Sequence, residues 1–106
     1  MSEIVQKAED FVTNLLQTEL DTKFLYHNLK HTQRVVKSAK ELLEHYQLND
    51  DENERLLLAA WFHDTGYTRG TDDHEKTSCT IADDFLTKEG LKQQSVEAVK
   101  NLIMAT

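Results

Sequence analysis

The chain has 106 residues, a formal net charge of −7 and a hydrophobic fraction of 39%. This length predicts one small domain with a single core, which we assign to residues 1–106. The acidic balance excludes a nucleic-acid backbone as partner, because no basic stripe is present to displace counterions. It leaves a small phosphorylated substrate open, since a bound cation reverses the local field.

Membrane and secreted classes are also disfavoured. No apolar stretch reaches the ~20 residues of a membrane span, and the start of the chain lacks the layout of a signal peptide. The single cysteine, Cys79, excludes an internal disulfide. We therefore expect a cytoplasmic protein without a membrane partner.

The first half of the chain predicts helices. Apolar residues recur at helical spacing from Ile4 to Leu16, with Ser2 as the N-cap. A second helix is predicted to begin at Asn28 as its N-cap. Its expected apolar face consists of Val35, Val36, Ala39, Leu42, Leu43 and Tyr46.

A third helix is predicted to open at Asp51, where Glu54 three residues later matches a capping box, and to end near Phe62. Because it is apolar almost all round, we expect it to be central and buried. The residues from Thr65 to Asp73 are predicted to form the main loop and the wall of a site.

A fourth helix is predicted to begin after Asp72 or Asp73 and to end at Gly90 as its C′ residue. A fifth begins near Lys92 or Ser95 and reaches Met104 or Ala105. These elements predict an all-α fold, an orthogonal bundle of about five helices.

The doublet His63-Asp64 is the most informative local feature, because it directly follows the apolar run of the third helix. Polar groups buried there need hydrogen-bond partners or a metal. An imidazole nitrogen beside a carboxylate oxygen suits a hydrolytic divalent metal. His31 and His74 are also expected near helix ends on inward faces, so the four side chains are predicted to converge.

Alternative interpretations of the histidines remain. A lone histidine on an apolar face is more often a satisfied core residue than a ligand. His27 and His31 have the i, i+4 spacing of a zinc-binding pair, but the glutamate of the metalloprotease pattern is missing. With Asn28 as N-cap, His27 would lie outside the helix. We therefore favour His31 as a ligand and His27 as a substrate-facing residue.

Three segments resemble, in order and spacing, the HD-domain superfamily of metal-dependent phosphohydrolases: Tyr26–Val35, Ala60–Tyr67 and His74–Ser78. The resemblance extends over Tyr26–Thr106. It implies an all-α fold with a divalent metal ion (Mn, Fe, Ni, Co, Mg or Zn). The residues that it assigns as metal ligands are His31, His63 and Asp64. Asp64 is also the expected catalytic residue, and those expected to bind substrate are His27, His74 and Glu75.

The chain departs from the family pattern at one ligand. The closing aspartate is expected from a helix after the one that ends near Met104, and Asp83 and Asp84 come too early in the order. We therefore expect the chain to be the N-terminal part of the domain, truncated at its C-terminal end. A naturally shortened, inactive relative is the alternative.

Three functional hypotheses follow. The first is a metal-dependent phosphohydrolase acting on a nucleotide or another phosphate ester in the full-length protein, with this fragment inactive. The second is a non-catalytic ligand-binding or regulatory module that lacks the fourth ligand. The third is a helical interaction protein with structural histidines. Truncation would leave apolar surface exposed, which favours a homo-oligomer.

Overall fold

The computed structural model describes residues 3–19, 22–69 and 73–105, with the backbone alone described for residues 22–28. These ranges contain helices α1 (Glu3–Glu19), α2 (Thr22–His45), α3 (Asp50–Phe62), η1 (Thr65–Arg69, a 3-10 helix), α4 (His74–Lys88) and α5 (Gln93–Met104). No strand occurs among them, so the predicted all-α fold is confirmed. The predicted N-cap Ser2 lies outside the described residues.

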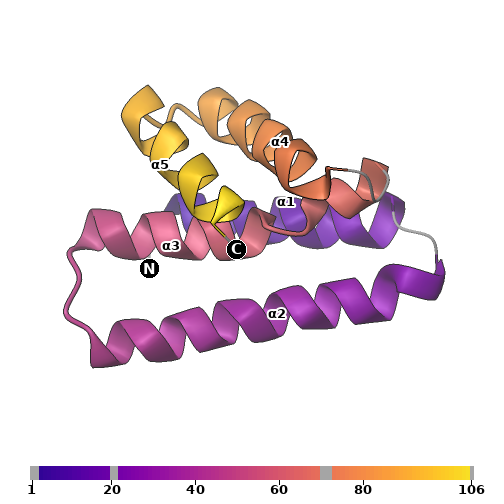
Figure 1. Ribbon diagram of the computed structural model, residues 1–106, viewed down its shortest axis with the longest axis horizontal. Coiled ribbons are helices and arrows are strands. Elements are labelled where there is room, and N and C mark those ends of the chain that lie inside the picture. The colour runs from indigo at the N-terminus through magenta and orange to yellow at the C-terminus, as the bar shows by residue number, and fades with distance from the viewer. Residues whose placement is uncertain (1–2, 20–21, 70–72, 106) are drawn as a thin grey trace.

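Helix α3 occupies the centre of the bundle, with α2 running alongside it and α4 and α5 crossing its other side (Figure 1). Its residues from Leu57 to Phe62 are all buried. Phe62 meets Phe85 of α4 at a ring-centroid distance of 5.6 Å, and Phe11 of α1 meets Phe85 at 4.5 Å. This aromatic cluster ties three helices together, and the predicted central position of α3 is confirmed.

Helix α2 corrects one prediction, because it begins at Thr22 and not at Asn28. The intervening residues include no glycine or proline, and an asparagine inside a helix costs less than ~1 kcal/mol relative to alanine. The helix therefore continues through Asn28, and His27 belongs to it.

The predicted apolar face of α2 is also wrong at Leu42 and Tyr46, whereas Leu43 packs against the core. Val36 and Ala39 are buried, but Leu42 is 52% exposed and Tyr46 65% exposed. Helix α2 packs on α1 and α3, and these two neighbours cover only part of its apolar stripe. The remainder borders a groove described below.

The start of α3 differs from the prediction by two residues. Asn49 is the N-cap: its Oδ1 accepts the Glu52 N–H at 2.8 Å, and Glu52 Oε1 accepts the Asn49 N–H at 3.3 Å. The sequence offers two overlapping capping boxes, Asn49/Glu52 and Asp51/Glu54. The earlier box forms, which leaves Asp50, Asp51 and Glu52 in the first turn, where negative charge stabilises the helix dipole.

Helix α4 begins and ends where predicted. It starts after Asp73, and Gly90 has a φ of 87°, the left-handed conformation that favours glycine at C′. The Leu91 N–H donates to the Leu86 carbonyl at 3.0 Å, and the Gly90 N–H donates to that of Thr87 at 3.1 Å. This is the Schellman pattern.

The segment predicted as the main loop is partly helical. Residues Thr65–Arg69 form η1, and Gly70 to Asp72 lie outside the described residues. The Thr65 hydroxyl donates to the Phe62 carbonyl at 2.8 Å, and the Thr68 hydroxyl donates to that of Thr65 at 2.7 Å. These local bonds satisfy backbone carbonyls and shape the turn after α3.

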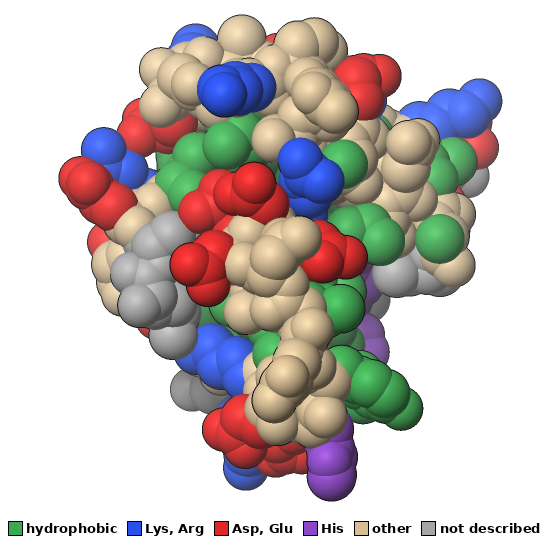
Figure 2. All heavy atoms as spheres, turned by 90° about the vertical axis from the view of Figure 1, so that its left-hand side faces the viewer, with side chains coloured by type: hydrophobic (Ala, Val, Ile, Leu, Met, Phe, Trp, Pro, Cys, Tyr) green, Lys and Arg blue, Asp and Glu red, His purple; other side chains and the backbone are tan. Residues whose placement is uncertain are grey.

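On the surface, acidic and hydrophobic side chains mix on the face that includes the start of α3 (Figure 2). None of the helices in the described part of the chain combines the length and apolarity that crossing a bilayer requires.

Candidate metal centre

His63 and Asp64 lie directly after α3 and are both buried. His63 Nδ1 lies 2.6 Å from the carbonyl oxygen of Ala60. Because a carbonyl can only accept, this contact places a proton on Nδ1 and leaves Nε2 of the neutral ring with a free lone pair. The last turn of α3 thus orients His63 as a ligand would be oriented.

Helix α2 brings His31 to the same place. Asp64 Oδ2 lies 3.3 Å from His31 Nε2 and 3.1 Å from His63 Nε2. One ligand atom of each of these three residues lies within 4.8 Å of the others. The structure therefore brings together the three side chains that the sequence singles out as metal ligands, with His31 on the exposed side.

The electrostatics of this group favour a positive charge between its members. Burial acts to lower the pKa of His63, but the hydrogen bond to Asp64, the Ala60 carbonyl and the Asp64 charge together raise it above its ordinary value. Burial acts to raise the pKa of Asp64, but the hydrogen bond from His63 and the charges of His63, His31 and His74 lower it. A carboxylate beside two imidazoles is thus held ionised.

The chemistry of the donors fits a divalent cation. Two imidazole nitrogens and one carboxylate oxygen face one another, and when both rings are neutral with the proton on Nδ1 all three atoms present lone pairs. Such an arrangement is stable only with protons or a metal ion between the atoms. Mixed nitrogen and oxygen donors suit Mn, Fe, Co, Ni or Zn.

His74 and Glu75 lie beside this group and not within it. His74 Nε2 is 3.4 Å from Glu75 Oε1, and the His74 ring stacks on Tyr67 with centroids 4.2 Å apart and an interplanar angle of 18°. His74 is close enough for its charge to act on Asp64. It therefore lies near the three residues without belonging to their group.

Other residues that the sequence analysis considered are engaged elsewhere or not described. The side chain of His27 lies outside the described residues. Asp83 pairs with Lys100 of α5 at 2.9 Å, which removes it from the ligand set as expected. Cys79 and Trp61 are buried core residues.

Two residues near the centre were not assigned a role from the sequence. Ser78 of α4 is fully buried and bonds to both His63 and Gly66, which links α4 to the turn after α3. The signal was present in the sequence, because Gly66 follows the His-Asp doublet and Ser78 follows His74 by four residues. Only the fold shows that they touch.

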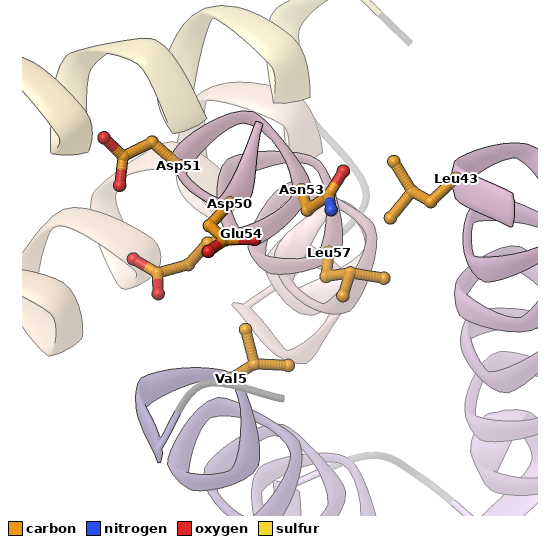
Figure 3. A pocket seen from close by; sticks show the side chains of 7 residues that line it. All are labelled: Val5, Leu43, Asp50, Asp51, Asn53, Glu54 and Leu57. Carbon is orange, nitrogen blue, oxygen red and sulfur yellow. The ribbon is translucent and has the colours of Figure 1, made fainter. Parts of the chain in front are cut away.

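A hollow of about 430 Å³ lies at the opposite end of α3. Figure 3 shows the side chains of Asp50, Asp51 and Glu54 on its side away from Leu43. These acids lie in the first turns of α3, where the helix dipole stabilises negative side chains. No histidine among the described residues lines this hollow. The residues that could hold a metal lie at the other end of α3.

An apolar groove of about 360 Å³ runs beside α3 and reaches His63. Its walls come from three helices: Val35, Ser38, Ala39 and Leu42 of α2, Leu56, Ala59, Ala60 and His63 at α3, and Leu102 and Ala105 at α5. A neighbouring hollow shares Leu56 and Leu102 and adds Glu52 and Arg55. We call the two together the α3 groove.

Comparison with known proteins gives one positive finding. The family model of the HD domain matches residues 28–105, which is most of the chain and includes His31, His63, Asp64 and His74. No curated protein and no solved structure matches the chain.

Proposed function

Because the chain belongs to the HD domain family, we propose that it carries the metal centre of a phosphohydrolase acting on a nucleotide or another phosphate ester. The observation that supports this most is the convergence of His31 Nε2, His63 Nε2 and Asp64 Oδ2. A divalent cation held by them would polarise a phosphoryl oxygen and lower the pKa of a water molecule.

The side chains divide the remaining work. Asp64 uses Oδ2 toward the two histidines, and we assign its Oδ1 to orient the attacking water. His74 faces the substrate and donates a hydrogen bond to the phosphoryl oxygens or the leaving group. Glu75 Oε1 lies 3.4 Å from His74 Nε2 and orients the ring. His27 is a second substrate-facing candidate on α2.

Three protein ligands leave coordination positions open, as hydrolytic metal sites require. No further carboxylate joins the three ligands among the described residues. A fourth position would be filled by water, by the substrate or by an aspartate from another segment. If no group fills the fourth position, the same fold would act as a non-catalytic module that binds a phosphorylated ligand.

We also propose that the chain self-associates through the α3 groove. The large hydrophobic residues that are exposed include Leu42 and Leu48, which line it. Glu52 and Arg55 carry opposite charges in the same wall. In a two-fold arrangement, Glu52 of each copy would pair with Arg55 of the other.

The metal assignment is tested by metal content and calorimetric titration with Mn, Co, Ni, Zn and Mg. We expect stoichiometric binding that His63→Ala and Asp64→Asn weaken by at least about 100-fold, since the first removes a ligand and the second replaces a charged ligand by a neutral one. His45→Ala, at the far end of α2, is the matched control and should bind as the parent chain does.

Hydrolysis is assayed separately on a panel of nucleotides and simple phosphate esters, with and without a C-terminal extension that supplies an aspartate. Turnover that disappears in Asp64→Asn supports the enzyme. Absence of turnover with every metal, together with unchanged metal content in His63→Ala, would refute it. Bound metal without turnover favours the non-catalytic module.

A further inference from the structure

A single buried hydroxyl joins α4 to the turn that carries His63 and Asp64. Ser78 Oγ donates to the His63 carbonyl at 2.9 Å and accepts the Gly66 N–H at 2.8 Å. Ser78 has no exposed surface, so both backbone groups depend on it in a place where an unpaired group is costly. The turn is thereby closed by a side chain from another helix.

Gly66 brings the two segments into direct contact. A Cβ at this position would overlap the carbonyl oxygen of His74 and lie 2.9 Å from Ser78 Oγ. Since real Cβ atoms essentially never come within 3.0 Å of such atoms, any larger residue would push the first turn of α4 away. The absence of a side chain here sets how closely α4 approaches Asp64.

The ring of His74 is held by the same turn. It stacks on Tyr67, the residue after Gly66, at a centroid distance of 4.2 Å. The backbone of His74 rests on Gly66 and its ring rests on Tyr67. The place of His74 and Glu75 relative to Asp64 therefore depends on the contact between η1 and α4.

We propose that Ser78 and Gly66 are positioning residues for the candidate centre. Through them the His63–Asp64 turn fixes the start of α4, and with it His74 and Glu75, at a set distance from the three ligands. The inference rests on the proposed function only in assigning His74 and Glu75 to the substrate side. Neither Ser78 nor Gly66 touches the substrate in this scheme.

The first test compares Ser78→Ala with Ser95→Ala. Both delete a hydroxyl that makes a hydrogen bond, but the Ser95 hydroxyl accepts from Arg55 and its bond does not involve the His63–Asp64 turn. In the metal-free chain we expect Ser78→Ala to speed hydrogen exchange of the Gly66 amide by about tenfold or more and to weaken the Tyr67–His74 ring contact in NMR. Ser95→Ala should change neither.

A second readout uses Mn²⁺ alone as a paramagnetic probe. The ion should broaden the ring signals of His74 in the parent chain and leave those of His45 sharp. Ser78→Ala should reduce the broadening of His74, whereas Ser78→Cys, which keeps a weak donor and acceptor, should restore part of it.

Like Ser78→Ala, Gly66→Ala should weaken the Tyr67–His74 ring contact and reduce the Mn²⁺ broadening of His74. Its control is Gly90→Ala, which strains a residue with a φ of 87° far from the centre and has open space around its Cβ. If Ser78→Ala is too unstable to study, this pair decides the matter.

Unchanged Gly66 exchange and unchanged His74 contacts in Ser78→Ala, or unchanged His74 contacts in Gly66→Ala, would overturn the inference. If the parent chain binds none of Mn, Co, Ni, Zn and Mg, the proposed function fails, while the metal-free measurements still decide the positioning role.

Discussion

At the scale of single residues, Asp64 is the side chain on which the centre depends. Its Oδ2 lies within 3.3 Å of two imidazole nitrogens that come from different parts of the chain. His63 is held in one orientation by the Ala60 carbonyl, whereas His31 is 55% exposed at its side chain. The group therefore has a buried inner half, His63 and Asp64, and an outer member, His31, that is open to solvent.

The pKa shifts of this pair predict an unusual pH dependence. The pKa of His63 is raised above 6.5, so its contribution to stability is fully present below about pH 6.5 and is lost as pH rises through the raised value. The pKa of Asp64 is lowered below 3.8, so its contribution is present above about pH 3.8 and is lost as pH falls through the lowered value.

With EDTA present, Tm should therefore fall as pH rises above neutrality. A bound metal needs neutral imidazoles, so the increase in Tm that Mn²⁺ causes should instead grow with pH. Thermal melts at about pH 5.5, 7 and 8.5, with EDTA and with Mn²⁺, measure both trends. His63→Ala should flatten both curves, and parallel curves for the parent chain would contradict the prediction.

At the scale of elements, the two ends of α3 divide its tasks. The first turn carries the acidic residues Asp50, Asp51 and Glu52 and the Asn49 cap, which stabilise the helix. The last turn carries the carbonyl that orients His63. The capping box thus fixes where α3 begins. The buried residues from Leu57 to Phe62 continue the helix from there to His63 and Asp64.

The position of this cap gives a direct prediction. Asn49→Ala should lower the free energy of unfolding by about 1 kcal/mol, because it removes the hydrogen bond to the Glu52 amide. For a domain of this size this corresponds to a Tm decrease of roughly 4–8 °C. Asp51→Ala, at the cap expected from the sequence, should cost less, since it loses only a first-turn charge. Chemical denaturation of both variants decides, and a larger loss in Asp51→Ala would place the cap at Asp51.

At the scale of the whole molecule, the α3 groove is an apolar surface that the described helices leave open. Helices α2, α3 and α5 form its walls, and its inner end is His63. Exposed apolar surface of this kind is typical of an interaction site. A second copy that covers the groove would also cover its His63 wall, and we expect association to alter solvent access to His63.

Self-association is predicted to depend on Leu42, which is half exposed and lines the groove. Leu42→Glu should raise the dissociation constant by at least about tenfold, because burying a leucine is worth about 1.5–3 kcal/mol. The matched control is Gln47→Glu, which adds the same charge at an exposed position near the end of α2. Sedimentation velocity over a concentration series measures the effect. A parent chain that stays monomeric throughout would rule the interface out.

The sequence by itself determined the helical class, the burial of α3 and the glycine cap of α4, because apolar periodicity and a left-handed C′ residue are local properties. It also singled out His31, His63, Asp64 and His74. It misplaced the start of α2, where no residue between Thr22 and Asn28 breaks the helix, and the cap of α3, where two equivalent boxes overlap.

Only the tertiary structure decided which of the local features meet. The open face at Leu42 depends on which helices pack against α2, and the link from Ser78 to His63 joins residues 15 positions apart. The 3.3 Å contact between Asp64 and His31 requires α2 to lie alongside the end of α3. Such contacts depend on packing between elements, which no local pattern contains.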